Sequence, residues 1–311
     1  MLILIFFRSV VFTDSGVLYT EPEDFGGGDP AVDYITLNDI KYKPDSFFIF
    51  AAVSNICAFL FTGAFYVKLK GAGHSKNLKF GLPKRKYLPL CLCMLLFLLA
   101  GTVLINALLL CLGGTDSHGV LPFLFYTDGN ALYDMGVLVC FVLLPAVCEE
   151  FFFRSVIAAD YEKHGAFCAC AFTALCFAIS HFSLILFPSY LFAAVTFYIL
   201  AKITNSVLFA VFLHMGYNFF CIYFADKFLA ALNFEQNQTM FIFASAIIFL
   251  ISAFFVLNAL EDIYYKKAYG NEPSPALLSE SHLKAVVRFF KSLLSPTFIA
   301  AIFIFFIYIN I

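Results

Sequence analysis

In the stretch Cys148-Glu149-Glu150-Phe151-Phe152-Phe153-Arg154, three charged side chains stand inside a long apolar run. A charge at the centre of a bilayer costs roughly 3 kcal/mol even on the more modest insertion scales. Glu150 and Arg154 are four residues apart, so on a helix they share a face and can form an ion pair. Glu149 is rotated away from that face by about 100° and has no obvious local partner. We therefore interpret this stretch as half of an active site.

The composition of the whole chain indicates a membrane protein. Of the 311 residues, 62% are hydrophobic and 13% are charged, whereas a soluble domain is about half apolar and about a quarter charged. The sequence therefore predicts an all-α fold, a polytopic membrane helical bundle with seven or eight transmembrane helices. The net charge is −2 and no basic domain stands out, so the expected partner is the lipid bilayer, and nothing supports binding of nucleic acid.

Charge and hydropathy divide the chain into four regions. Residues 1–46 form an acidic extracytoplasmic N-terminal arm, and residues 47–131 form N-terminal transmembrane helices around a basic cytoplasmic loop. That loop, at 68–86, carries lysines and an arginine but no acid, which places it in the cytoplasm. Residues 132–224 form a third region, which contains the charged stretch quoted above. Residues 225–311 form C-terminal transmembrane helices with an amphipathic cytoplasmic segment, which lies on the inner leaflet or packs on the ends of the bundle.

Proline and polar turns set the expected limits of the spans. We expect a span at 166–187 that stops at Pro188, followed by a short or re-entrant helix at 190–201. The other expected spans have polar or charged residues at their ends, and they cover residues 47–67, 87–112, 132–160, 205–224, 240–260 and 297–311.

Two histidines and an asparagine complete the set of candidate site residues. His214 and Asn218 are four residues apart and share a helix face, as do Phe177 and His181, so that Phe177 can support the imidazole ring. Gly165, in the turn between two spans, lies midway between Glu150 and His181, which puts each about 22 Å along its helix. The same count places the two histidines within about 6 Å of each other in depth. We therefore expect the three segments to converge inside the membrane.

These residue types suit hydrolysis of an amide bond. A glutamate can accept a proton from water as a general base. The histidines either ligate a divalent metal that lowers the pKa of its bound water, or orient the water and polarise the carbonyl without a metal. Asn218 can donate a hydrogen bond to the developing oxyanion, which is typically worth about 3 kcal/mol.

The ordered set Glu149-Glu150-x-x-x-Arg154, Phe177-x-x-x-His181 and His214-x-x-x-Asn218 resembles the CAAX protease and bacteriocin-processing family of intramembrane endopeptidases, also called the Abi family. The resemblance covers residues 132–224 and implies that they form the catalytic core. It implies that Glu149 and His181 activate the water, that Glu150 and Arg154 support them, and that His214 and Asn218 stabilise the oxyanion. If Zn²⁺ is bound, its candidate ligands are His181, His214 and Glu149.

The resemblance implies an integral, multi-pass membrane protein, which we expect in a prokaryotic plasma membrane. Its expected partner is a membrane-embedded peptide or protein substrate, either a prenylated protein or a small peptide such as a bacteriocin. Two other interpretations use the same polar cluster. One is a non-enzymatic bacteriocin-immunity factor or transporter, although no internal repeat typical of many transporters stands out. The other is a scaffold degenerated from the protease, against which the intact motifs argue.

Overall fold

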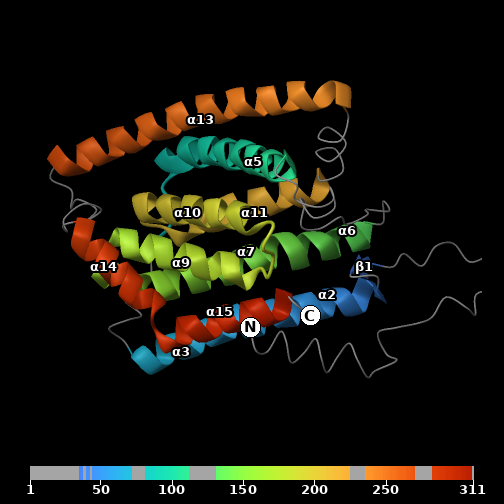
Figure 1. Ribbon diagram of the computed structural model, residues 1–311, viewed down its shortest axis with the longest axis horizontal. Helices are drawn as coiled ribbons and strands as arrows, with labels where there is room; N and C mark the ends of the chain where they lie inside the picture. The colour runs from blue at the N-terminus through green and yellow to red at the C-terminus, as the bar shows by residue number, and fades with distance from the viewer. Residues whose placement is uncertain are drawn as a thin grey trace, which may run out of the picture.

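The computed structural model describes residues 35–37, 40–42, 44–71, 81–111, 131–224, 235–269 and 282–309, and these are almost entirely helical (Figure 1). One short antiparallel pair, β1 (Ile35–Leu37) and β2 (Ile40–Tyr42), precedes the first helix. This pair is a small exception to the predicted all-α fold. The rest of the predicted acidic arm before it, residues 1–34, lies outside the described residues.

The helices follow the apolar segments of the sequence. In chain order they are α2 (Pro44–Asn55), η2 (Ile56–Phe61), α3 (Thr62–Lys70), η3 (Arg85–Tyr87), α5 (Leu88–Cys111), α6 (Ala131–Val137), η5 (Leu138–Leu143), α7 (Leu144–Glu150), η6 (Phe151–Ile157), α8 (Ala158–Tyr161), η7 (Glu162–His164), α9 (Ala166–Ser180), α10 (Phe187–Thr204), α11 (Val207–Tyr223), α13 (Glu235–Tyr269), α14 (His282–Leu293) and α15 (Pro296–Ile309). The segments η2, η5 and η6 are π-helical, and each lies inside a longer continuous helix.

Among the described residues, five helices are long and apolar enough to cross a membrane. The number rises to six if the bent pair Val287–Leu293 and Pro296–Ile307, with 59° between its parts, is one span. The predicted count of seven or eight is higher because it also included α9 and α11. These apolar helices have 15 and 17 residues, fewer than the roughly 20 that a span normally needs.

The predicted helix limits around Pro188 are wrong. The helix expected to run to residue 187 ends at Ser180, and α10 begins at Phe187 with Pro188 in its first turn. Proline is favoured there because the first N–H groups of a helix have no partner within the helix. Pro188 therefore starts a helix instead of stopping one. The expected short or re-entrant helix at 190–201 is part of an 18-residue apolar helix that meets the length and composition of a span.

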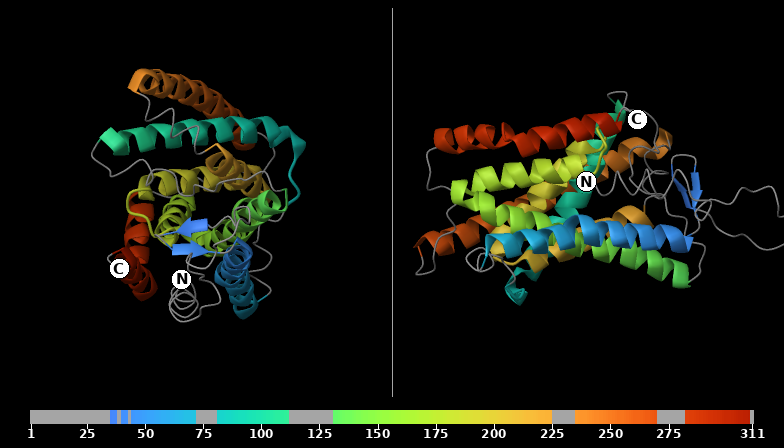
Figure 2. Two further views of the ribbon diagram at one scale, coloured as in Figure 1. Left: turned by 90° about the vertical axis from the view of Figure 1, so that its right-hand side faces the viewer. Right: turned by 90° about the horizontal axis from the view of Figure 1, so that it is seen from below.

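Helix α10 lies at the centre of the bundle. It contacts α9, α11 and α5, and its residues Ala194, Phe197 and Leu200 are completely buried. Figure 2 shows that α13 lies outside α5, on the side away from α7 and α9. The amphipathic helix predicted near the carboxyl end is present as α14, and Phe289 packs on Phe167 of α9.

Two ion pairs join helix ends at one end of the bundle. Lys70 Nζ lies 3.2 Å from Asp160 Oδ2, and Lys202 Nζ lies 3.0 Å from Glu162 Oε2. Tyr66 also donates a hydrogen bond to Asp160. The carboxyl-terminal end of α3, which begins the basic segment 68–86, therefore lies at the same end of the bundle as α8, η7 and the end of α10. We call this end of the bundle the basic end.

Candidate active site

The predicted pair between Glu150 and Arg154 is present and completely enclosed. Arg154 Nε lies 3.0 Å from Glu150 Oε2, and both side chains have no exposed surface. The guanidinium also donates from Nη2 to the carbonyl of Ala194 at 3.1 Å. Its carbon lies 4.6 Å from the ring centre of Phe177 and 5.3 Å from that of Phe197. Aromatic faces attract cations, so this cage helps to hold the buried charge.

Glu150 also holds His214, which sequence spacing did not reveal. His214 Nδ1 lies 2.9 Å from Glu150 Oε1, and the imidazole stacks on Phe197 with ring centres 4.7 Å apart. A carboxylate only accepts hydrogen bonds, so Nδ1 carries the proton and donates it. Glu150 thus bridges Arg154 and His214, and Nε2 of His214 is left for other interactions.

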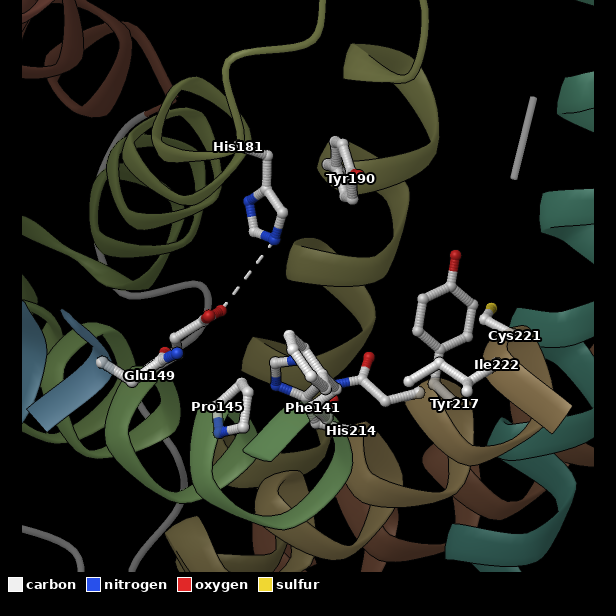
Figure 3. Close-up of a pocket in the computed structure, with 11 residues that line it drawn as sticks. Phe141, Pro145, Glu149, His181, Tyr190, His214, Tyr217, Cys221 and Ile222 are labelled. Carbon is white, nitrogen blue, oxygen red and sulfur yellow. Dashed lines mark hydrogen bonds and ion pairs between the residues drawn. The ribbon is translucent and has the colours of Figure 1, made fainter. Parts of the chain in front are cut away.

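Glu149, the residue before Glu150, faces His181. Figure 3 shows the two side chains directed toward each other, with Glu149 Oε2 4.0 Å from His181 Nε2. Glu149 is buried, and among the described residues its Oε2 has no hydrogen-bond partner. His181 Nδ1 donates to the carbonyl of Phe177 at 2.8 Å, so Nε2 of the neutral ring carries the lone pair that faces Glu149.

Two aromatic rings fix the plane of the His181 imidazole. Tyr190 stacks on it with ring centres 4.0 Å apart and planes 28° apart (Figure 3). Phe177 approaches at 4.6 Å, so the predicted support from Phe177 is confirmed. His181 itself comes directly after α9 and before Phe182, which has a left-handed backbone with φ of 52°. These rings hold a side chain that the helix no longer constrains.

A cavity of about 200 Å³ brings the motif residues together. It is lined by Asn55, Phe141, Pro145, Glu149, His181, Tyr190, His214, Tyr217, Asn218, Cys221 and Ile222. The cavity thus unites Glu149, His181, His214 and Asn218, whereas Glu150 and Arg154 lie behind it. Phe141 precedes Glu149 on its span and Ile222 follows His214 on α11, so the cavity extends away from the basic end.

Pro145 explains how Asn218 is held. Proline has no N–H, so it cannot donate to the carbonyl of Phe141, four residues earlier, as a helix normally requires. Asn218 Nδ2 donates to that carbonyl at 3.3 Å. This bond ties α11 to the span that carries Glu149. It uses one of the two N–H bonds of the amide and leaves the other for a ligand.

The structure adds cavity residues that the motifs did not indicate. Asn55 comes from the first span, Tyr190 from α10 and Tyr217 from α11. Tyr217 lies three residues after His214, so helical spacing could have indicated it. The position of Asn55 depends on how two separate spans pack, and no pattern within the sequence carries that information.

The described residues do not form a complete metal site. Among the described residues, no group of three or more His, Cys, Asp or Glu side chains is placed to hold a metal ion, and a catalytic zinc usually has three protein ligands. Of the candidate ligands, Glu149 and His181 face each other, and His214 binds Glu150 through Nδ1, which leaves its Nε2 open. Zinc binding by His181, His214 and Glu149 therefore stays a prediction.

One family model matches the segment that carries the three motifs. Residues 131–220 match the family model of Rce1-like proteins, described as type II CAAX prenyl endopeptidase Rce1-like. No curated protein and no solved structure matches the chain. The matched segment contains all three motifs and coincides with most of the predicted catalytic core, 132–224, so the family resemblance is confirmed.

The buried ion pair predicts a large effect of Arg154 on stability. Arg154→Met should lower the free energy of unfolding by about 3 kcal/mol, because it leaves the Glu150 carboxylate buried without its cation. The double variant Arg154→Met with Glu150→Gln should recover part of that loss, since the uncompensated charge is gone. Denaturant unfolding in detergent micelles measures the free energy of unfolding of the unmodified protein, of Arg154→Met and of the double variant.

Lys70→Met is the matched control for this measurement. It breaks an ion pair whose lysine side chain is 43% exposed, so it should cost much less stability than Arg154→Met. Equal losses for Arg154→Met and Lys70→Met, or a further loss on adding Glu150→Gln, would contradict the structural role given to the buried pair.

Proposed function

We propose that the chain, whose residues 131–220 match the Rce1-like family of type II CAAX prenyl endopeptidases, is an intramembrane endopeptidase that hydrolyses a peptide bond with a water activated by Glu149 and His181. The observation that carries the proposal is the arrangement of the cavity. One wall presents Glu149 and His181 to each other at 4.0 Å, and His214 lines the same space with Nδ1 already bound to Glu150.

The first step activates the water. A separation of 4.0 Å between Glu149 Oε2 and His181 Nε2 lets one water molecule lie within about 2.8 Å of both atoms, an ordinary hydrogen-bond distance. The water donates one hydrogen to each, which points its lone pairs into the cavity. Glu149 takes a proton as the water oxygen attacks the carbonyl carbon, and the C–O π electrons move to the carbonyl oxygen.

The second step stabilises the resulting tetrahedral oxyanion. In its protonated form His214 donates from Nε2 to the oxyanion while Nδ1 donates to Glu150, and the second N–H of the Asn218 amide adds another donor. The Glu150 carboxylate and the oxyanion then balance the Arg154 guanidinium and the His214 imidazolium, since Glu149 is now the neutral acid. That formal neutrality suits a buried site, where an unpaired charge is costly.

The third step breaks the amide bond. The electron pair of the oxyanion re-forms the carbonyl, the C–N bond breaks, and the leaving nitrogen takes the proton held by Glu149. The products are a carboxylic acid and an amine. Glu150 and Arg154 do not touch the reacting atoms in this scheme, and they act by holding His214.

The substrate that we propose is a membrane-associated peptide, either a prenylated chain of the CAAX type or a small peptide such as a bacteriocin. Support comes from the aromatic and aliphatic cavity lining, which includes Phe141, Tyr190, Tyr217 and Ile222. Apolar walls favour apolar residues beside the scissile bond. A prokaryotic plasma membrane remains the location that we expect.

Loss of the general base should abolish cleavage. Glu149→Gln keeps the shape of the side chain but cannot accept the proton, so the turnover rate should fall about 10³-fold. His181→Ala and His214→Ala should each reduce the rate about 10²-fold or more. The assay uses purified protein in lipid nanodiscs and an internally quenched peptide that ends in prenylcysteine followed by three residues.

Glu162→Gln provides the control, since Glu162 pairs with Lys202 at the basic end, away from the cavity. It should cleave at the rate of the unmodified protein. Full activity of Glu149→Gln, or equal losses for Glu149→Gln and Glu162→Gln, would refute the proposed role of Glu149.

The mechanism derived from the chain's own residues needs no zinc. Treatment with a strong chelator, followed by its removal, should leave the cleavage rate within about twofold of the untreated rate, because the water is held by two side chains. Metal analysis of the active protein should show much less than one zinc per chain. A rate that is lost on chelation and restored by Zn²⁺ alone would show that the enzyme depends on the metal.

A further inference from the structure

Asn55 reaches the candidate active site from a part of the chain that no motif covers. It is the last residue of α2, in the first span, and it lines the same cavity as Glu149, His181 and His214. The family match begins only at residue 131. A polar residue on this span therefore forms part of the cavity wall next to the motif residues.

One hydrogen bond orients the side chain of Asn55 and leaves its other hydrogen-bonding groups available. Its Nδ2 donates to the carbonyl of Ala51, one turn earlier in the same helix, at 3.0 Å. This bond fixes the amide plane and leaves one N–H and the Oδ1 oxygen, which together can donate and accept. Among the described residues, the Asn55 side chain makes no other hydrogen bond, so it does not join its span to another helix, which is the usual structural use of asparagine in membrane bundles.

The backbone at Asn55 is also irregular. The π-helical segment η2 begins at the next residue, Ile56, and continues to Phe61. Single π-helical turns inside α-helices are often found at functional sites, because the extra residue redirects the side chains beside it. The span that carries Glu149 has π-helical segments on both sides of α7.

Tight packing fixes this span against the span that carries Glu149. The ring of Phe59 packs on Phe152 and Phe153, with centres 5.8 and 5.7 Å apart. At Gly63 a methyl group would lie only 2.8 Å from the ring of Phe151, so the absent side chain allows the close approach. Asn55 is therefore held at a set position relative to Glu149.

We propose that Asn55 is a substrate-positioning residue that binds a main-chain peptide group next to the scissile bond. The remaining N–H and Oδ1 match the C=O and N–H of a peptide unit. A peptide that enters an apolar cavity loses the water bound to these groups, and each unsatisfied group costs several kcal/mol. The inference rests on the proposed function only in taking a peptide as the substrate.

The test compares Asn55→Leu with Asn106→Leu. Asn106 is a buried asparagine of α5 that accepts a hydrogen bond from Ser189 at 2.6 Å and does not line the cavity. Each variant is made in the unmodified chain for kinetics. Each is also combined with Glu149→Gln, so that binding of the intact quenched prenylcysteine peptide is measured in nanodiscs without cleavage.

Asn55→Leu should weaken binding about fivefold to tenfold, since one or two neutral hydrogen bonds are lost. It should raise KM by a similar factor and change kcat less than about twofold. Asn106→Leu should lower the thermal unfolding midpoint without changing binding. A peptide with an ester in place of the amide next to the scissile bond should bind to the protein with Asn55 more weakly than the normal peptide does. This loss of affinity should be no larger than the loss that Asn55→Leu causes for the normal peptide.

The outcomes separate this inference from the proposed function. Binding that depends on Asn55 without any hydrolysis refutes the proposed function and supports the positioning role. Hydrolysis that proceeds with unchanged KM in Asn55→Leu refutes the positioning role alone. The role is also refuted if both asparagine variants weaken binding equally, or if the protein with Asn55 does not bind this peptide.

Discussion

The buried ion pair between Arg154 and Glu150 is the interaction on which the rest of the site depends. Neither charge has any exposed surface, so each must be satisfied by the protein. Arg154 reaches the carbonyl of Ala194 on α10, and Glu150 reaches His214 on α11. One pair of charges thus sets the relative position of three helices at the centre of the bundle. It also leaves Glu149 as the acid that faces the cavity.

Interactions within one helix could be predicted from the sequence. The pairing of Glu150 with Arg154 and the contact of Phe177 with His181 follow from a spacing of four residues, because that spacing fixes both distance and direction. The hydrogen bond from His214 to Glu150 could not be predicted. It depends on how α11 is rotated about its axis toward α7, and a spacing along the chain does not determine the rotation of separate helices. For the same reason the position of Asn55 could not be predicted, because its span packs on η6 through aromatic rings.

Two prolines shape the site in ways that hydropathy does not show. Pro145 lies inside the third span and has no N–H to donate to the Phe141 carbonyl four residues earlier, and Asn218 donates to that carbonyl. Pro188 lies in the first turn of α10, so α9 ends earlier than predicted and His181 follows its last residue. There the ring is held by Tyr190, Phe177 and a backbone carbonyl. Both departures from a regular helix place a polar side chain at the cavity.

The central claim is that Glu149 and His181 act on the same water molecule. A double-mutant cycle on the cleavage rate tests it directly, with Glu149→Gln, His181→Ala and the two combined, all assayed on the quenched prenylcysteine peptide. Groups that act as a unit show strongly non-additive losses. The double variant should therefore be no slower, within about threefold, than the slower single variant. Losses that multiply in the double variant would show that the two residues act independently and would contradict the shared water.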